Sequence, residues 1–109
     1  MRYLNFTQIM SVRSDNPEAI VEMAAEWDQH QATSDVMGYM GSHVLADRND
    51  PGHYLIVAEF GVVDPDVSAA DEAMKNNDRP VTQEWARKLD EVTEGETEFS
   101  DYDEIYRTG

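Results

Sequence analysis

The stretch SHVLADRNDPGHYLIVAEF, residues 42–60, contains two arms rich in apolar residues, joined by the segment RNDPG. Pro51 and Gly52 have the backbone preferences of a tight turn. A turn of this kind between two runs of β-branched and aromatic residues predicts a β-hairpin, with strands at 37–47 and 53–61. Because a hairpin supplies two neighbouring strands, this segment limits the chain to folds that contain an antiparallel sheet.

The two arms also predict a register. If Asp47 pairs with His53, then His43 lies opposite Val57. One face of the hairpin is then almost wholly apolar, and we expect helices to cover it; it holds Met40, Val44, Ala46, Tyr54, Ile56 and Phe60. The other face combines polar and apolar side chains: Tyr39, His43, Leu45, Asp47, His53, Leu55, Val57 and Glu59. Such a mixed face suits a subunit contact or a cavity wall better than open water.

A strand and a helix precede the hairpin. Residues 2–12 are rich in aromatic and β-branched types, and the better core face of this predicted strand holds Leu4, Phe6, Gln8, Met10 and Val12. Asn16 can cap a following helix, and Pro17 suits the first helical position. The buried stripe of this helix is predicted from helical spacing as Ile20, Ala24, Trp27 and Gln31, flanked by Met23 and His30.

Two helical segments and a last strand follow the hairpin. Asp64 and Pro65 are predicted to open the first segment; a second begins near Pro80 and stops at Gly95. The buried stripe of the second is predicted as Val81, Trp85, Leu89 and Val92. Residues 97–107 have the mixed faces expected of an edge strand or of a strand handed to a partner subunit. The order strand, helix, strand, strand, helix, strand predicts a ferredoxin-like split βαβ fold of the α+β class, with an antiparallel sheet in a single domain, 1–109.

The charge of the chain excludes several classes of function. There are 23 acidic residues against 8 Lys and Arg, which gives a net charge of -15. This balance argues against binding to nucleic acid, which requires cationic groups, and against an anionic membrane surface. The excess of acids fits either adaptation to high salt or an ordinary acidic surface. No cysteine, secretory signal pattern or long apolar run is present, so we expect a cytoplasmic protein.

The segment VMGYMGSHVLADRNDPGHYLIVAEF resembles the central hairpin of the antibiotic biosynthesis monooxygenase (ABM) domain, a type within the dimeric α+β barrel superfamily. The likeness lies in the glycine-containing entry, the Asp/Pro/Gly turn, and the Glu59–Phe60 ending. The later part, ADEAMKNNDRPVTQEWARKLDEVTEGETEFSDYDEIY, resembles a branch of small proteins with that fold and no settled role. The resemblance implies a homodimer in which two sheets form one barrel, with a small-molecule cavity between sheet and helices.

The resemblance also limits the chemistry. Haem-degrading members carry a first-strand Asn, a Trp and a later His ligand; Asn5 and Trp85 lie near the first two positions, but no histidine follows His53. Haem degradation is therefore not expected. Aromatic oxygenases of this type often carry a Trp after the Glu of the third strand, where Phe60 stands here. We expect no metal and no other cofactor.

The candidate site residues follow from these patterns. His43 could act as a general base oriented by Glu59, or could simply fill a half-polar subunit face. Asn5 and Gln8 are amides in an apolar strand, so they need partners from the protein or from a ligand. The predicted catalytic residues are Asn5 and His43. The predicted ligand-binding residues are Gln8, Trp27, His30, Tyr39, Glu59, Phe60 and Trp85, several of which could equally be core.

Two functions stay open at this point. The first is a small-molecule-binding ABM-like protein that oxidises an aromatic or quinol-like compound without a cofactor. The second is a non-catalytic ligand-binding or dimerisation module of the same fold. Oxygen uptake that depends on Asn5 and His43 would distinguish the enzyme from the module.

Overall fold

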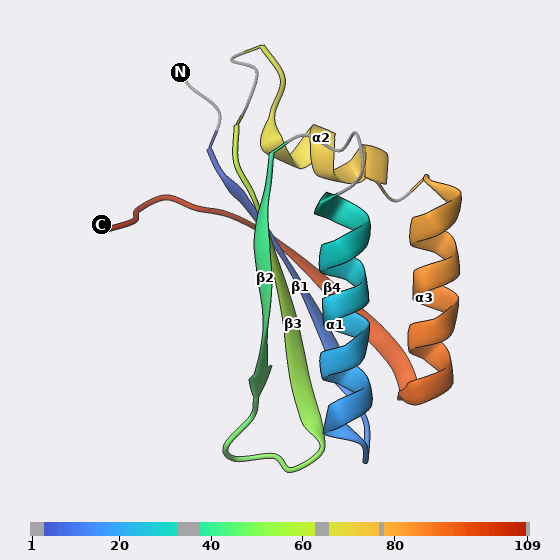
Figure 1. The fold of residues 1–109 in the computed structure, drawn as a ribbon. Helices are drawn as coiled ribbons and strands as arrows, with labels where there is room; N and C mark the ends of the chain where they lie inside the picture. Colours follow the sequence, from blue (N-terminus) through green and yellow to red (C-terminus); the bar gives the residue numbers. More distant parts are fainter. Residues whose placement is uncertain (1–3, 33–37, 63–65, 77, 109) are drawn as a thin grey trace.

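A computed structural model describes residues 4–32, 38–62, 66–76 and 78–108 of the chain. The elements, in chain order, are β1 (Phe6–Arg13), α1 (Pro17–Ala32), β2 (Tyr39–Ala46), β3 (His53–Phe60), α2 (Ala69–Asn76), α3 (Pro80–Val92) and β4 (Glu94–Asp103). The four strands form one antiparallel sheet in the order β2-β3-β1-β4. Figure 1 shows the helices on one face of this sheet. The predicted ferredoxin-like α+β fold is confirmed.

The predicted hairpin register is confirmed over most of its length. His43 lies opposite Val57, and the Asp47 amide donates to the His53 carbonyl at 3.0 Å. The prediction for Met40 was wrong: Tyr39, not Met40, lies opposite Phe60. A β-bulge between Tyr39 and Gly41 adds one residue, so the residues before Gly41 point to the opposite faces from those predicted. Met40 is therefore 51% exposed.

This exchange moves Tyr39 to the core side of the sheet. Its ring packs against Phe60 with centroids 5.7 Å apart, and its hydroxyl donates to Asp28 of α1 at 2.9 Å. Burial raises the pKa of Tyr39 to about 12, so the hydroxyl stays protonated at neutral pH. Tyr39 therefore belongs to the contact between β2 and α1 and not to the mixed face.

The core lies between the sheet and the helices. The predicted inner face of the first strand is buried from Phe6 to Val12, but Leu4 is 42% exposed, so the prediction for Leu4 was wrong. The predicted helix stripes are confirmed in part: Ile20, Ala24, Trp27, Trp85 and Leu89 are buried, and Val81 and Val92 are half-buried. The side chain of Gln31 lies outside the described part of the chain. The apolar core consists of Phe6, Met10, Val12, Ile20, Met23, Trp27, Ile56, Ala58, Phe60, Ala69, Ala73, Trp85 and Leu89. Each large side chain among them contributes about 1.5–3 kcal/mol by leaving water.

Helix boundaries follow local hydrogen bonding. Asn16 caps α1 as predicted, because its Oδ1 accepts the Ala19 amide at 3.3 Å. Asp64 and Pro65, the predicted start of the next helix, lie outside the described residues. Helix α2 begins at Ala69, and Ser68 Oγ accepts the Asp71 amide at 3.0 Å.

Helix α3 begins at Pro80, as predicted, but it ends at Val92 and not at Gly95. Thr93 is already extended, and its hydroxyl donates back to the Leu89 carbonyl at 3.0 Å. Gly95, with φ 70°, lies inside the start of β4 instead. Strand β4 is an exposed edge strand, as predicted, and it follows α3 directly. Through this short connection, α3 and β4 line the same cavity.

Candidate ligand cavity

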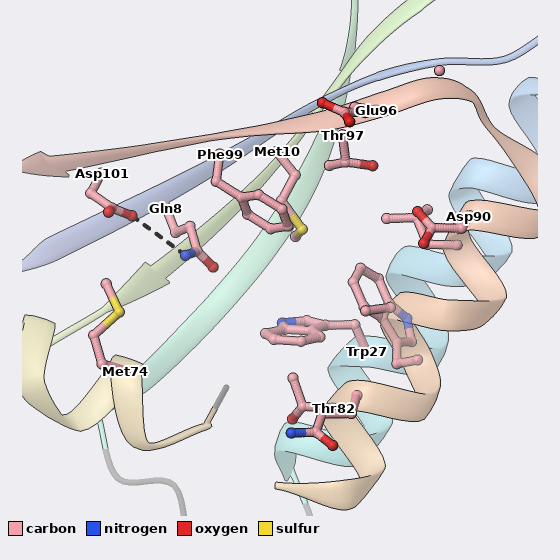
Figure 2. A pocket seen from close by; sticks show the side chains of 15 residues that line it. Gln8, Met10, Trp27, Met74, Thr82, Asp90, Glu96, Thr97, Phe99 and Asp101 are labelled. Atoms are coloured by element: carbon pink, nitrogen blue, oxygen red, sulfur yellow. Dashed lines mark hydrogen bonds between the residues drawn. The ribbon is translucent and has the colours of Figure 1, made fainter. Parts of the chain in front are cut away.

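A cavity of about 680 Å³ lies between the helices and the β1–β4 side of the sheet. Figure 2 shows side chains from β1, β4 and the helices around it. Its apolar walls are formed by Met10, Trp27, Met74, Trp85, Ala86, Leu89 and Phe99. This size falls within the range of about 300–1,000 Å³ that is usual for small-molecule sites.

Two indole rings form one end of the cavity wall. Trp27 of α1 and Trp85 of α3 have ring centroids 4.8 Å apart and planes inclined at 57°. Trp85 Nε1 donates to the Met23 carbonyl at 2.8 Å. Trp27 is only 3% exposed, yet its Nε1 has no hydrogen-bond partner among the described residues. The Tyr39 hydroxyl lies near this indole, but it donates to Asp28 and does not meet Nε1 with hydrogen-bond geometry.

A second unpaired polar atom lines the same cavity. Thr97 Oγ1, on β4, is buried and has no partner within the described part of the chain. Gln8, which is 9% exposed, donates through Nε2 to Asp101 Oδ1 at 3.4 Å (Figure 2). A buried polar group without a partner typically costs about 1–3 kcal/mol. Two such groups on one cavity are therefore most simply explained by a ligand or water that hydrogen bonds to them.

The open side of the cavity is acidic. Three exposed carboxylates line it: Asp90 at the end of α3, and Glu96 and Asp101 on β4. None of the described lining residues is Lys, Arg or His. The site therefore combines aromatic walls, two free buried donors and a negative rim.

Three of the predicted ligand-binding residues meet at this cavity. Gln8, Trp27 and Trp85 all line it, as the amide in an apolar strand and the tryptophans at helical spacing indicated. The structure places the other predicted site residues elsewhere: Asn5, His30, Tyr39, His43, Glu59 and Phe60 do not line the cavity.

The contacts of these residues explain their positions. Asn5 Nδ2 donates to Glu104 at 3.1 Å, and its Oδ1 accepts the Val62 amide at 3.3 Å, so both ends of the amide are used by the protein. Phe60 is core, at 1% exposure. His43 is exposed on β2, beside α1.

Glu59 and His30 each contact another side chain at the surface. Glu59 lies 3.4 Å from the Arg107 guanidinium. His30 Nε2 lies 3.5 Å from Glu26, which also accepts a hydrogen bond from Lys88 at 2.9 Å. The Lys88 ammonium holds the pKa of Glu26 below its usual value. These pairs connect α1 to α3 and the C-terminal segment to β3.

A histidine beside a turn is expected to be solvated, but the structure shows His53 between two other side chains. Its side chain is 22% exposed and lies between Ser11 Oγ, 2.6 Å from Nε2, and Asp47 Oδ2, 2.9 Å from Nδ1. Strand β1 pairs with β3 so that Arg13 lies opposite His53, which places Ser11 diagonally across from the ring. Asp47, Asp50 and His53 could together approach a metal ion, but Asp50 already pairs with Arg13 and Asp47 holds His53.

Comparison with known proteins gives a structural likeness without a sequence match. No protein-family model matches the chain, and no curated protein matches it significantly in sequence. Among solved structures, a Deinococcus radiodurans protein assigned to the antibiotic biosynthesis monooxygenases superposes with a TM-score of 0.68 at 13% identity, over 95% of this chain and 96% of its own. SnoaB, a cofactor-independent oxygenase of Streptomyces nogalater, superposes with a TM-score of 0.66 at 12% sequence identity. The superposition covers 95% of this chain and 96% of SnoaB.

A Nitrosomonas europaea protein with the same assignment as the Deinococcus protein gives a TM-score of 0.67 at 13% identity, over 100% and 98% of the two chains. The chain has the fold of the antibiotic biosynthesis monooxygenases. At such identities the ABM likeness concerns the fold alone. The structure also contains no helix, within its described residues, that is long and apolar enough to cross a bilayer.

Proposed function

We propose that the chain is an ABM-like protein that binds a planar aromatic or quinol-like compound in the cavity between its sheet and helices. The observation that carries this proposal is the pair of unpaired polar atoms, Trp27 Nε1 and Thr97 Oγ1, on a cavity with aromatic walls. Flat apolar walls suit a fused ring system, and both free donors suit a carbonyl or phenolic oxygen on it.

The same arrangement supports oxidation of the bound compound without a cofactor. Donors aimed at a ring oxygen stabilise negative charge on that oxygen when an electron-rich ring loses a proton. The resulting anion can itself reduce oxygen. For an anthrone, the ring CH2 becomes a carbonyl, one atom of O2 enters the product and the other leaves as water. Likeness of fold to SnoaB, a cofactor-independent oxygenase, supports this reaction class.

A non-catalytic binding module is the second candidate, and one observation favours it. The described residues that line the cavity include no His, Tyr, Lys or Cys, so carboxylates are its only titratable groups. A carboxylate is a weak base for a phenol or an anthrone at neutral pH. A module would bind the same compounds and leave them unchanged.

Oxygen uptake with a panel of anthrones and quinols distinguishes the two functions. If the chain is an enzyme, oxygen uptake should fall in Trp27→Phe and in Thr97→Val, because these variants lack the free donors. Uptake should persist in His43→Ala, because His43 lies outside the cavity. Binding without uptake supports the module. Uptake lost in His43→Ala or Asn5→Ala, but unaffected by the cavity variants, would place the chemistry outside this cavity and overturn the proposed site.

We further propose that the chain forms a homodimer through the sheet face that the helices leave open. Several apolar side chains remain exposed there or at its margin, among them Leu45, at 46%, and Tyr102. The ABM-like hairpin implies such a dimer. Sedimentation velocity should show a dimer that Leu45→Asp weakens, whereas Val21→Asp, on the exposed side of α1, serves as a matched control. A monomer at all concentrations would contradict the proposal.

A further inference from the structure

The charge of the cavity rim separates ligands that would otherwise fit equally well. Asp90, Glu96 and Asp101 line the open side, and no described lining residue carries a positive charge. We propose that the cavity selects neutral or, preferentially, cationic aromatic compounds, such as a fused ring that bears an amine, and rejects aromatic carboxylates. This inference rests on the proposed binding function, and it adds the charge class of the ligand.

The buried donors and the exposed carboxylates offer a ligand two kinds of polar contact. Trp27 Nε1 and Thr97 Oγ1 are buried atoms without a partner among the described residues, whereas the three carboxylates belong to exposed residues. A ring oxygen can therefore accept a hydrogen bond from a buried donor. An ammonium group on the same ring can remain partly hydrated at the open side of the cavity while it faces the carboxylates. A carboxylate there would face charges of its own sign.

Nearby cations do not neutralise the rim. On α3, Arg87 pairs with Glu84 at 2.5 Å and with Glu91 at 2.7 Å, and Lys88 pairs with Glu26 at 2.9 Å. By contrast, Asp90 and Glu96 form no ion pair with any described residue, and Asp101 holds only the neutral Gln8 amide. The net charge of -15 adds a long-range field of the same sign.

A matched ligand series measures this selection. Aminomethyl, hydroxymethyl and carboxyl groups are placed on the same ring carbon of anthraquinone, and binding is followed at neutral pH and low salt by calorimetry. One unit charge about 6 Å away in a hydrated rim changes affinity roughly three- to tenfold. We therefore expect the ammonium compound to bind at least about tenfold more tightly than the carboxylate, with the neutral compound between them.

Variants of the rim carboxylates and added salt test whether the rim causes this difference in affinity. In the double variant Asp90→Asn, Glu96→Gln, the difference in affinity between the ammonium and carboxylate compounds (the affinity spread) should become severalfold smaller. Neither side chain makes a hydrogen bond or ion pair with the described residues, so the variant should fold normally. Glu22→Gln, an exposed acid of α1 away from the cavity, should leave the spread unchanged. Added salt should also reduce the spread.

Two failures are distinguishable. If the neutral compound does not bind, the proposed function itself fails. If the neutral compound binds and the three affinities are equal, or the carboxylate binds most tightly, the binding function stands and the charge selection is overturned. A spread that persists unchanged in the Asp90→Asn, Glu96→Gln variant would likewise overturn the role of the rim.

Discussion

The indole rings of Trp27 and Trp85 contact each other with centroids 4.8 Å apart, yet only Trp85 has a partner for its N–H group among the described residues. Both rings are buried and both line the cavity. Two similar side chains in one contact therefore have different roles: Trp85 joins α3 to α1 through the Met23 carbonyl, and Trp27 presents a free donor.

The two tryptophans should differ in their contribution to stability. Replacement by Phe removes a similar part of the ring in each case, but only Trp85→Phe also loses a hydrogen bond. Trp85→Phe should therefore lower the free energy of unfolding by about 1 kcal/mol more than Trp27→Phe does. Urea denaturation measures the difference. Equal losses, or a larger loss in Trp27→Phe, would show that the Trp27 N–H is satisfied within the protein.

Asn5 should prove to be structural. Its amide joins Glu104 to the backbone at Val62, so Asn5→Ala should lower the free energy of unfolding by about 1–2 kcal/mol and leave ligand affinity in the cavity unchanged. His43→Ala, an exposed position on β2, should change neither property. Parallel denaturation and calorimetry test both variants. If Asn5→Ala kept normal stability but lost ligand binding, Asn5 would be a ligand-binding residue and not a structural one.

The glycines at the start of β2 should differ in their tolerance of a side chain. Gly38 has φ 86°, and a Cβ there would clash with the Gly61 carbonyl oxygen, whereas Gly41, with φ 137°, faces open space. Gly38→Ala should therefore cost well over about 1 kcal/mol, and Gly41→Ala closer to about 1 kcal/mol from backbone strain alone. Thermal or urea unfolding compares them. A Gly41→Ala loss equal to that of Gly38→Ala would contradict the described backbone of the bulge.

Asp47 should make stability depend on pH in the acid range. Its hydrogen bond with His53 is the main cause that lowers the pKa of Asp47 in the folded state. A depressed pKa contributes stability above the ordinary Asp value near 3.8, and that contribution is lost as pH falls toward the folded-state value. The stability difference between the natural chain and Asp47→Asn should therefore shrink below about pH 4. Urea denaturation of both chains across pH 3–6 tests this prediction. A stability difference that grows as the pH falls would contradict it.

Local patterns were sufficient to predict much of the fold. The Asp47–His53 register follows from the turn at Pro51 and Gly52, and the inner face of β1 follows from simple alternation. The bulge at Met40 could not be predicted in this way, because alternation assumes an uninterrupted ladder and Gly41 carries no side chain that would signal the extra residue.

The cavity was predicted only in part, for a similar reason. Gln8 and the two tryptophans stand out against regular apolar patterns, so they were among the candidate residues, and they line the cavity. Thr97 and the rim acids on β4 lie in an edge strand without clean alternation, where an acid-rich sequence gives no contrast. The Ser11–His53–Asp47 contact depends on pairing between β1 and β3, which are distant in sequence.

The most direct test is a titration of unsubstituted anthraquinone, followed by quenching of tryptophan fluorescence, in the natural chain and in Ala86→Phe. Ala86 lines the cavity, and a Phe there would fill part of it. We predict saturable quenching with a Kd on the order of 100 µM or tighter, and its loss in Ala86→Phe while Val21→Asp, outside the cavity, retains it. Absent or non-saturable quenching, or saturable quenching unchanged by Ala86→Phe, would contradict a ligand site between the sheet and the helices.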